Sequence, residues 1–123
     1  MQFRYHDLGV EQAKVQHVVE REIRLLERRL ADLPDDLPQL DITMEHHQRS
    51  DTYTARLLLR VPNRDLVARG DGQTPAQALR DAFSDLYDEV ERFLSKLRRE
   101  DAIRRARQHP GTVKPPLSTE GSE

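Results

Sequence analysis

Residues 61–97 read VPNRDLVARGDGQTPAQALRDAFSDLYDEVERFLSKL, and this stretch predicts a turn, a strand and a helix in direct succession. Pro62-Asn63 is typical of a tight turn, and LVAR at 66–69 has the composition of a short strand before the polar GDGQ. TPAQ at 74–77 is a well-formed helix start, with Thr as N-cap, Pro at the first helical position and Gln placed to reach back. The long helix that follows has an apolar stripe that begins at Leu79.

Apolar residues at alternate positions predict three further strands, at 1–8, 39–47 and 53–61. Between the first two, Val15 to Leu33 contains apolar residues at helical spacing, which predicts a helix of about six turns that ends at the prolines of LPDDLP. The predicted order is β-α-β-β-β-α. It indicates an α+β fold, a four-stranded, mostly antiparallel sheet with two helices packed on one face.

The apolar stripe of the second helix stops near Leu97, so a helix over 98–107 would have no core to pack on and should project from the body. The sequence QHPGTVKPPLSTEGSE at 108–123 is rich in Pro, Gly, Ser and Thr, a composition that does not repay the entropy of ordering. We therefore expect one domain at 1–100, and a helix extension with a disordered C-terminal tail at 101–123.

The composition excludes several classes of chemistry. The chain has 123 residues, a formal charge of -2 and no cysteine, so disulfides, thiolate nucleophiles and cysteine zinc sites are absent. No apolar run approaches the roughly 20 residues that span a bilayer, and MQFRYHDLGV lacks the uncharged core of a secretory signal. We expect a cytoplasmic protein that has no contact with a membrane.

Residues that could carry catalysis or bind metal are poorly arranged for either. His46 and His47 are adjacent on a predicted strand and point to opposite faces, so they cannot easily share a metal. The GDGQTP segment at 70–75 lacks the Lys-Ser/Thr of a phosphate loop and the third Gly of a dinucleotide fingerprint. We expect no catalytic residues, no metal, no cofactor and no small-molecule substrate, and hence a protein that is not an enzyme.

Cations are concentrated on the outer side of the first helix. Taking 100° per residue, Lys14, Arg21, Arg24 and Arg28 all project away from the core stripe, while the glutamates lie on the flanks. A line of one sign attracts anions locally, because charges act over about a Debye length, roughly 8 Å at physiological salt. The ordinary alternative, a solubilising face of Glu-Arg pairs, explains this feature equally well.

The second helix changes sign along its outer line. Asp81, Asp85 and Asp88 come first, and the cations Arg92, Lys96 and Arg99 follow. The helix dipole favours carboxylates only in the first turn, so it does not account for the two later aspartates. The distal half of this line could bind phosphates, whereas the proximal half would repel them.

The hairpin and helix of this chain resemble those of the ribosome hibernation-promoting factor and ribosome-associated inhibitor family, also called sigma-factor modulation proteins. The RVPNRDLVARG hairpin and the helix from TPAQAL to SKL carry most of the similarity. VQHVVEREIRLLER is similar to the family's first helix, with Arg21, Arg24 and Arg28 near its basic positions. The resemblance covers about residues 1–100. The matched hairpin and second-helix positions are Pro62, Asn63, Leu66, Val67, Ala68, Gly70, Ala78, Leu79, Leu86, Arg92 and Lys96.

The resemblance implies a protein that binds the small ribosomal subunit near the decoding region and blocks messenger and transfer RNA when growth slows. It implies that basic residues of the two helices contact ribosomal RNA phosphates. Asp85 and Asp88 depart from the pattern, because the family usually carries Lys and Arg there. The extra C-terminal dimerisation domain of longer members is also missing, as in the shorter inhibitor type.

The leading hypothesis is a ribosome-bound hibernation factor whose partners are the small subunit and its RNA. The expected RNA-binding residues are Arg21, Arg24, Arg28, Arg92, Lys96 and Arg99. The alternative is a paralogue of the same fold that has lost the ribosome and acts as a protein-binding stress module through its acidic residues. A third possibility is a homodimer in which the acidic half of one helix meets the basic half of another; we expect a monomer.

Overall fold

The computed structural model describes residues 1–33 and 38–108 and confirms the predicted α+β fold. Two predicted features, the LPDDLP segment and the tail beyond 108, lie largely or wholly outside the described residues. The elements follow in the expected order: β1 (Gln2–Leu8), α1 (Gln12–Arg29), β2 (Gln39–His47), β3 (Thr52–Val61), β4 (Arg64–Gly72) and α2 (Pro75–Gln108).

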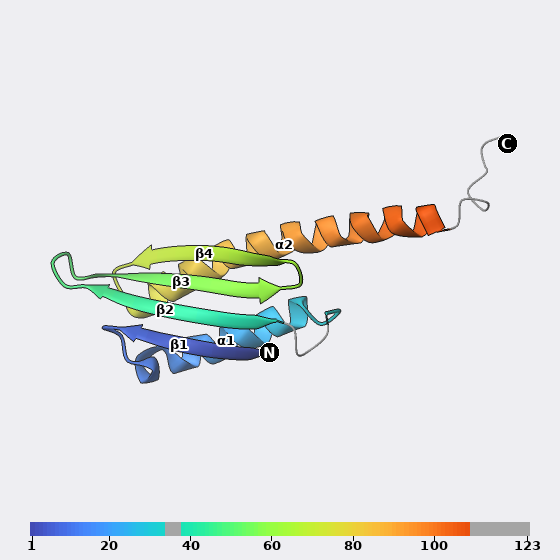
Figure 1. The fold of residues 1–123 in the computed structure, drawn as a ribbon. Coiled ribbons are helices and arrows are strands. Elements are labelled where there is room, and N and C mark those ends of the chain that lie inside the picture. Colours follow the sequence, from blue (N-terminus) through green and yellow to red (C-terminus); the bar gives the residue numbers. More distant parts are fainter. Residues whose placement is uncertain (34–37, 109–123) are drawn as a thin grey trace, which may run out of the picture. The chain divides into compact units, whose positions relative to one another are not determined.

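The four strands form one mixed sheet in the order β1-β2-β3-β4 (Figure 1). β1 runs parallel to β2, while the β2–β3 and β3–β4 pairs are antiparallel. Ile42, Leu57 and Ala68 lie side by side across three strands and are all buried, so the alternation seen in the sequence selects one buried face. β1 and β4 are the edges of the sheet.

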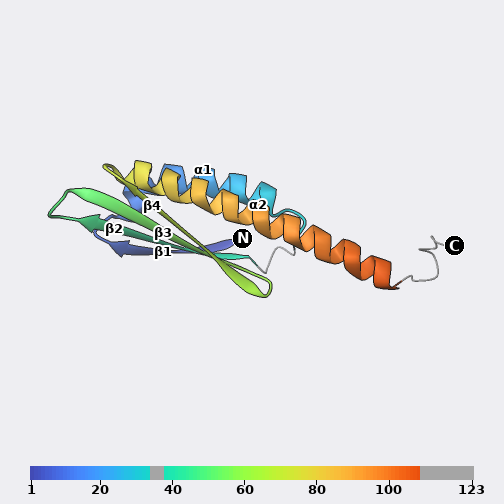
Figure 2. The same cartoon turned by 90° about the horizontal axis from the view of Figure 1, so that it is seen from above.

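Both helices cover the same face of the sheet, as Figure 2 shows for α1 and the first part of α2. The hydroxyl of Tyr87 on α2 donates a hydrogen bond to the backbone carbonyl of Glu22 on α1, 3.1 Å away, so the two helices are in direct contact. Hydrophobic stripes of the two helices meet the buried sheet face. The helix residues in this core are Val15, Val18, Val19, Ile23, Leu26, Ala78, Leu79, Ala82, Phe83, Leu86 and Val90, and Leu30 joins them just beyond the end of α1.

The first helix is shorter than the sequence predicted. It ends at Arg29, and Leu30 leaves the helical conformation with φ -100° and ψ 16°. The Leu33 amide then bonds to the Leu30 carbonyl at 3.0 Å, which is a tighter turn than an α-helix makes. The apolar spacing continues through Leu33, but the backbone does not continue as a helix.

The close approach of α2 to β4 depends on Gly70. A Cβ atom at this position would lie 2.2 Å from the backbone nitrogen of Ala82 and 2.3 Å from the carbonyl oxygen of Ala78. Glycine on the strand and alanines on the helix therefore let the two backbones touch. This contact fixes where the first turns of α2 lie on the sheet.

The turn and the helix start that were predicted from residues 61–97 are confirmed. Asn63 has φ 67°, the left-handed conformation that the third position of a type II turn requires after Pro62. At the helix start, the Thr74 hydroxyl accepts a hydrogen bond from the Gln77 amide at 3.1 Å. The Gln77 side chain reaches back to the Gln73 amide at 2.9 Å, one residue earlier than a capping box would place it.

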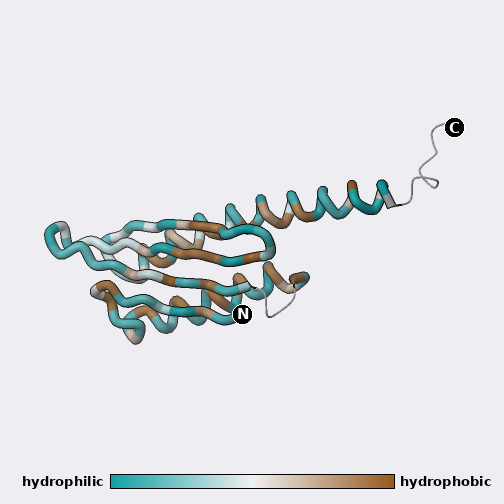
Figure 3. The backbone as a smooth tube through the Cα atoms, in the orientation of Figure 1, coloured by the Kyte–Doolittle hydropathy of each residue, from teal (hydrophilic) through white to brown (hydrophobic). Residues whose placement is uncertain are grey.

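The chain divides into two compact units, Met1–Val90 and Glu91–Glu123, which are described separately. The first contains the sheet, α1 and the start of α2, and its strands carry the long hydrophobic stretches in Figure 3. In the second, Phe93 is buried, whereas the side chains from Arg98 to Arg107 are exposed apart from the half-buried Asp101. The boundary at residue 100 remains a prediction.

Candidate nucleic-acid interface

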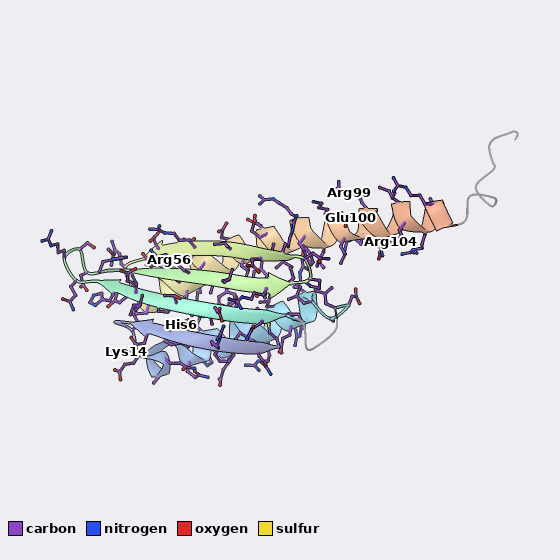
Figure 4. The ribbon with its side chains drawn as sticks, in the orientation of Figure 1. His6, Lys14, Arg56, Arg99, Glu100 and Arg104 are labelled. Atoms are coloured by element: carbon purple, nitrogen blue, oxygen red, sulfur yellow. The ribbon has the colours of Figure 1, made fainter. Side chains whose placement is uncertain are left out.

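Four cations form an exposed line on α1, which we call the α1 basic line: Lys14, Arg21, Arg24 and Arg28. Their spacing places them on the side of the helix that faces away from its buried stripe, as the sequence predicted. Within residues 1–33 and 38–108, none of the four forms an ion pair with a carboxylate. Figure 4 marks Lys14, at the start of this line.

Three of the α1 glutamates are engaged by groups other than these cations. The carboxylate of Glu20 accepts a hydrogen bond from the Gln16 side-chain amide at 3.0 Å. Glu27 pairs with the amino group of Met1 at 3.0 Å, and Glu22 accepts from the Tyr87 hydroxyl at 3.3 Å. Within the described residues, the glutamates of α1 therefore do not pair with the four cations of the α1 basic line.

Two of the three α2 aspartates bind the backbone of the edge strand. Asp85 accepts a hydrogen bond from the Arg69 amide at 3.3 Å, and Asp81 accepts one from the Asp71 amide at 3.2 Å. These amides lie on the outer side of β4, the edge strand of the sheet, where none of the described strands is placed to accept them. The sequence placed both aspartates on a free acidic line, and no local motif signalled these bonds. Asp88 is exposed.

The second predicted set of RNA-binding residues belongs to the Glu91–Glu123 unit. Arg92, Lys96 and Arg99 are all exposed on α2. Nearby, Arg98 donates to the Ser95 hydroxyl at 3.4 Å, and Arg104 pairs with Asp101 at 3.4 Å. Figure 4 marks Arg99 on this part of the helix. The structure thus brings Arg21, Arg24 and Arg28 together on α1 and holds the other three cations in the second unit.

A groove lies between α1 and α2, lined by Leu25, Arg28, Arg29 and Tyr87, and its volume is about 300 Å³. We call it the α1–α2 groove. The hydroxyl of Tyr87 is held by the carbonyl and carboxylate of Glu22, which fixes the ring in place. Burial raises the pKa of Tyr87, and the neighbouring Glu22 carboxylate raises it further, so the ring stays neutral. The sequence does not indicate this groove, because Tyr87 lies at the flank of the apolar stripe of α2 and belongs to no recognisable motif.

On the face of the sheet that no described helix covers, arginines form ion pairs with carboxylates of the same face. Arg4 pairs with Asp41 at 3.1 Å, and Arg60 reaches the same carboxylate at 3.7 Å. Arg56, marked in Figure 4, donates to Glu45 at 2.9 Å, and this hydrogen bond lowers the pKa of Glu45. These arginines are already paired, so the face is a weaker candidate for phosphates than the α1 basic line.

The two adjacent histidines have separate local partners. His46 stacks on Tyr53 with ring centroids 4.5 Å apart, and its Nε2 lies 2.9 Å from the Asp51 carboxylate. His47 Nε2 lies 2.8 Å from the Thr54 hydroxyl. Over residues 1–33 and 38–108 no group of three potential ligands could hold a metal ion. Nor does the described part of the chain contain a helix long and apolar enough to cross a membrane.

Comparison with solved structures confirms the fold that the family resemblance predicted. A ribosomal subunit interface protein from Coxiella burnetii superimposes with a TM-score of 0.63 at 10% identity, over 77% of this chain and 99% of that one. The N-terminal domain of Thermus thermophilus Protein Y gives a TM-score of 0.62 at 16% identity, over 76% of this chain and 99% of that domain. No protein-family profile and no curated protein matches the sequence.

Proposed function

We propose that this protein binds the small ribosomal subunit through ribosomal RNA and thereby restrains translation, as hibernation factors do. The fold is shared with a ribosomal subunit interface protein from Coxiella burnetii, which supports a ribosomal partner. The residues that we assign to RNA contact are the predicted ones: Arg21, Arg24, Arg28, Arg92, Lys96 and Arg99. Lys14 extends the α1 line by two turns and is added to them.

One observation supports this proposal most strongly: among the residues that the structure describes, the α1 basic line forms no ion pair with a carboxylate, while the nearby glutamates are engaged elsewhere. A guanidinium already paired with a glutamate must break that pair before it can bind a phosphate. An unpaired one needs only to displace water, and the phosphate releases its condensed counterions when it is neutralised. The line therefore presents positive charge locally, although the whole chain carries a formal charge of -2.

The acidic-module alternative loses most of its support at α2. A protein-binding acidic patch needs carboxylates that are available to a partner. Asp81 and Asp85 are hydrogen-bonded to the backbone of β4, which leaves Asp88 as the aspartate of that line that is free to act.

The decisive experiment is sedimentation of the protein with purified small subunits. The double variant R21E/R24E should be released, because two phosphate contacts become repulsive. The matched control is R49E/R64E, which changes the charge equally at two exposed arginines in or beside turns of the sheet. This control should remain bound. Retention of R21E/R24E, or equal release of both variants, would show that α1 does not contact the RNA.

Salt dependence provides an independent test. The affinity for small subunits should fall steeply as KCl rises, with a log-log slope of roughly 0.7 to 0.9 per phosphate contacted. With several cations of α1 and α2 engaged, the total slope should be at least about 3 by the same relation. An affinity that is unchanged between low and moderate salt would contradict the proposal.

A further inference from the structure

The α1–α2 groove combines an apolar surface with cationic lining residues, both within the Met1–Val90 unit. It is lined by Leu25, Arg28, Arg29 and Tyr87, and its surface is mostly apolar. Leu25 is 38% exposed, although it is a large apolar residue on a helix whose other large apolar residues are buried. Two of the four lining residues are arginines, and Arg28 also belongs to the α1 basic line.

We infer that this groove accepts one unpaired nucleobase of a single-stranded RNA segment, whose phosphates lie along the α1 basic line. Single-stranded RNA is recognised by splayed bases that stack on aromatic rings or guanidinium planes, while cations follow the backbone. Tyr87 and Arg28 supply such surfaces, and Leu25 supplies an apolar contact. The inference rests on the proposed function, because it identifies which form of RNA the same site takes.

The size and charge of the groove favour a single base over other occupants. Its volume of about 300 Å³ is at the small end of the range for ligand pockets, which suits one planar group. The cationic lining favours an anion-bearing ligand and disfavours a basic or purely apolar peptide. The ring of Tyr87 is fixed before binding by its hydrogen bonds to Glu22, so little entropy is lost when a base stacks on it.

The first test separates stacking from charge by combining variants with salt titration. Tyr87→Phe keeps the aromatic ring but loses the hydroxyl that holds it, so it should bind small subunits less tightly than the natural protein and more tightly than Tyr87→Leu. Tyr87→Leu keeps apolar volume but loses the ring, and should weaken binding between about 5- and 150-fold, the loss that corresponds to one base–aromatic stack. Its salt slope should not change, because stacking releases no counterions. Arg28→Gln should instead reduce the slope by about 0.7 to 0.9.

Two outcomes for the Tyr87 variants would overturn the inference. If Tyr87→Leu binds as tightly as Tyr87→Phe, no base stacks in the groove. The inference is equally overturned if Tyr87→Leu lowers the salt slope as Arg28→Gln does. Circular dichroism should show that each variant folds as the natural protein does, and Leu25→Ser provides a second variant at a partly exposed position that keeps the bonds of Tyr87. Leu25→Ser should also weaken binding at an unchanged slope, and unaltered binding would contradict the inference.

The second test places a fluorescent reporter in the groove. The chain contains no tryptophan, so Leu25→Trp introduces a single one. Its emission should be quenched when small subunits bind, because an unpaired base stacks on the indole. The control is Val67→Trp, at a residue that is 64% exposed on β4, and its emission should be unchanged. Sedimentation in the same samples distinguishes the two proposals: absence of binding refutes the ribosomal function, whereas binding of the Leu25→Trp variant without quenching refutes only the groove.

Discussion

The carboxylate of Asp85 accepts a hydrogen bond from the backbone amide of Arg69, with 3.3 Å between Oδ2 and nitrogen. One helical turn earlier, Asp81 binds the Asp71 amide in the same way. These bonds join α2 to the open edge of β4, where unpaired amides would otherwise be available to another strand. Asp85 therefore has a structural partner in this chain, because its carboxylate joins α2 to the edge strand.

Replacing Asp85 with alanine should destabilise the protein by about 1 kcal/mol, the usual net contribution of one hydrogen bond. The control is Asp88→Ala, at an exposed aspartate for which the described residues show no hydrogen bond or ion pair. It should change stability by less than about 0.5 kcal/mol. Urea denaturation at pH 7 measures both variants. Equal midpoints would show that the bond to Arg69 contributes nothing.

Asp88→Lys should strengthen binding to small subunits without loss of stability. This aspartate precedes Arg92, the first of the distal cations, by one helical turn, and lysine there would remove one repulsive charge and add one attractive charge. Asp85→Lys makes the same change in charge but also breaks the bond to β4, so it should gain less and unfold at lower urea. Sedimentation at two salt concentrations checks the affinity. A weaker Asp88→Lys complex would mean that the acid faces a cationic group on the subunit.

Gly70→Ala should destabilise the fold by about 3 kcal/mol or more, toward the upper end of the cost of overpacking. The added methyl would lie 2.2 Å from the Ala82 nitrogen, so α2 must move away from β4. Val67→Ala on the same strand changes an exposed side chain and should have little effect. Thermal unfolding followed by circular dichroism compares the two. A Gly70→Ala protein as stable as the natural one would show that the helix and strand are less closely packed.

The sequence predicted the elements well because each has a strong local signal. Alternation located three strands, and Pro62-Asn63 and the TPAQ segment located the turn and helix start. β4 begins at Arg64, two residues before the predicted strand, because its limits are set by pairing with β3 and not by its own composition. α1 ends at Arg29 because backbone geometry, which the apolar spacing does not encode, changes at Leu30.

The candidate site was predicted less completely, since its character depends on contacts between distant residues. The positions of Arg21, Arg24 and Arg28 follow from helical spacing, and their exposure is confirmed. Their freedom from carboxylates could not be predicted, because it depends on the partners of neighbouring glutamates, such as Tyr87 for Glu22. That hydrogen bond joins residues 65 positions apart, and neither residue belongs to a local motif that would indicate it.

The hydroxyl of Tyr5 should make the protein sensitive to alkaline conditions. This group donates to the Val10 carbonyl at 2.8 Å, and burial, followed by the charge of Asp7, raises the pKa of Tyr5 to about 12 from the ordinary value of 10.0. Below pH 10 the phenol of Tyr5 is protonated in both the folded and unfolded states, so it contributes its full amount to the free energy of unfolding. As pH rises from 10 to about 12, the unfolded chain loses this proton first, and the free energy of unfolding falls.

Tyr5→Phe should therefore lose stability less steeply over this pH window than the natural protein does. Tyr53→Phe is the matched control. It removes a tyrosine hydroxyl that does not take part in the hydrogen bond to Val10, and it keeps the ring that stacks on His46. Urea midpoints measured at intervals from about pH 9 to 12 give the slopes, and phenolate absorbance of the folded protein gives the titration directly. Parallel curves for Tyr5→Phe and Tyr53→Phe would show that the Tyr5 hydroxyl is not preferentially protonated in the native state. The natural protein should show the steeper fall, because its folded form retains a proton that the unfolded chain has already released.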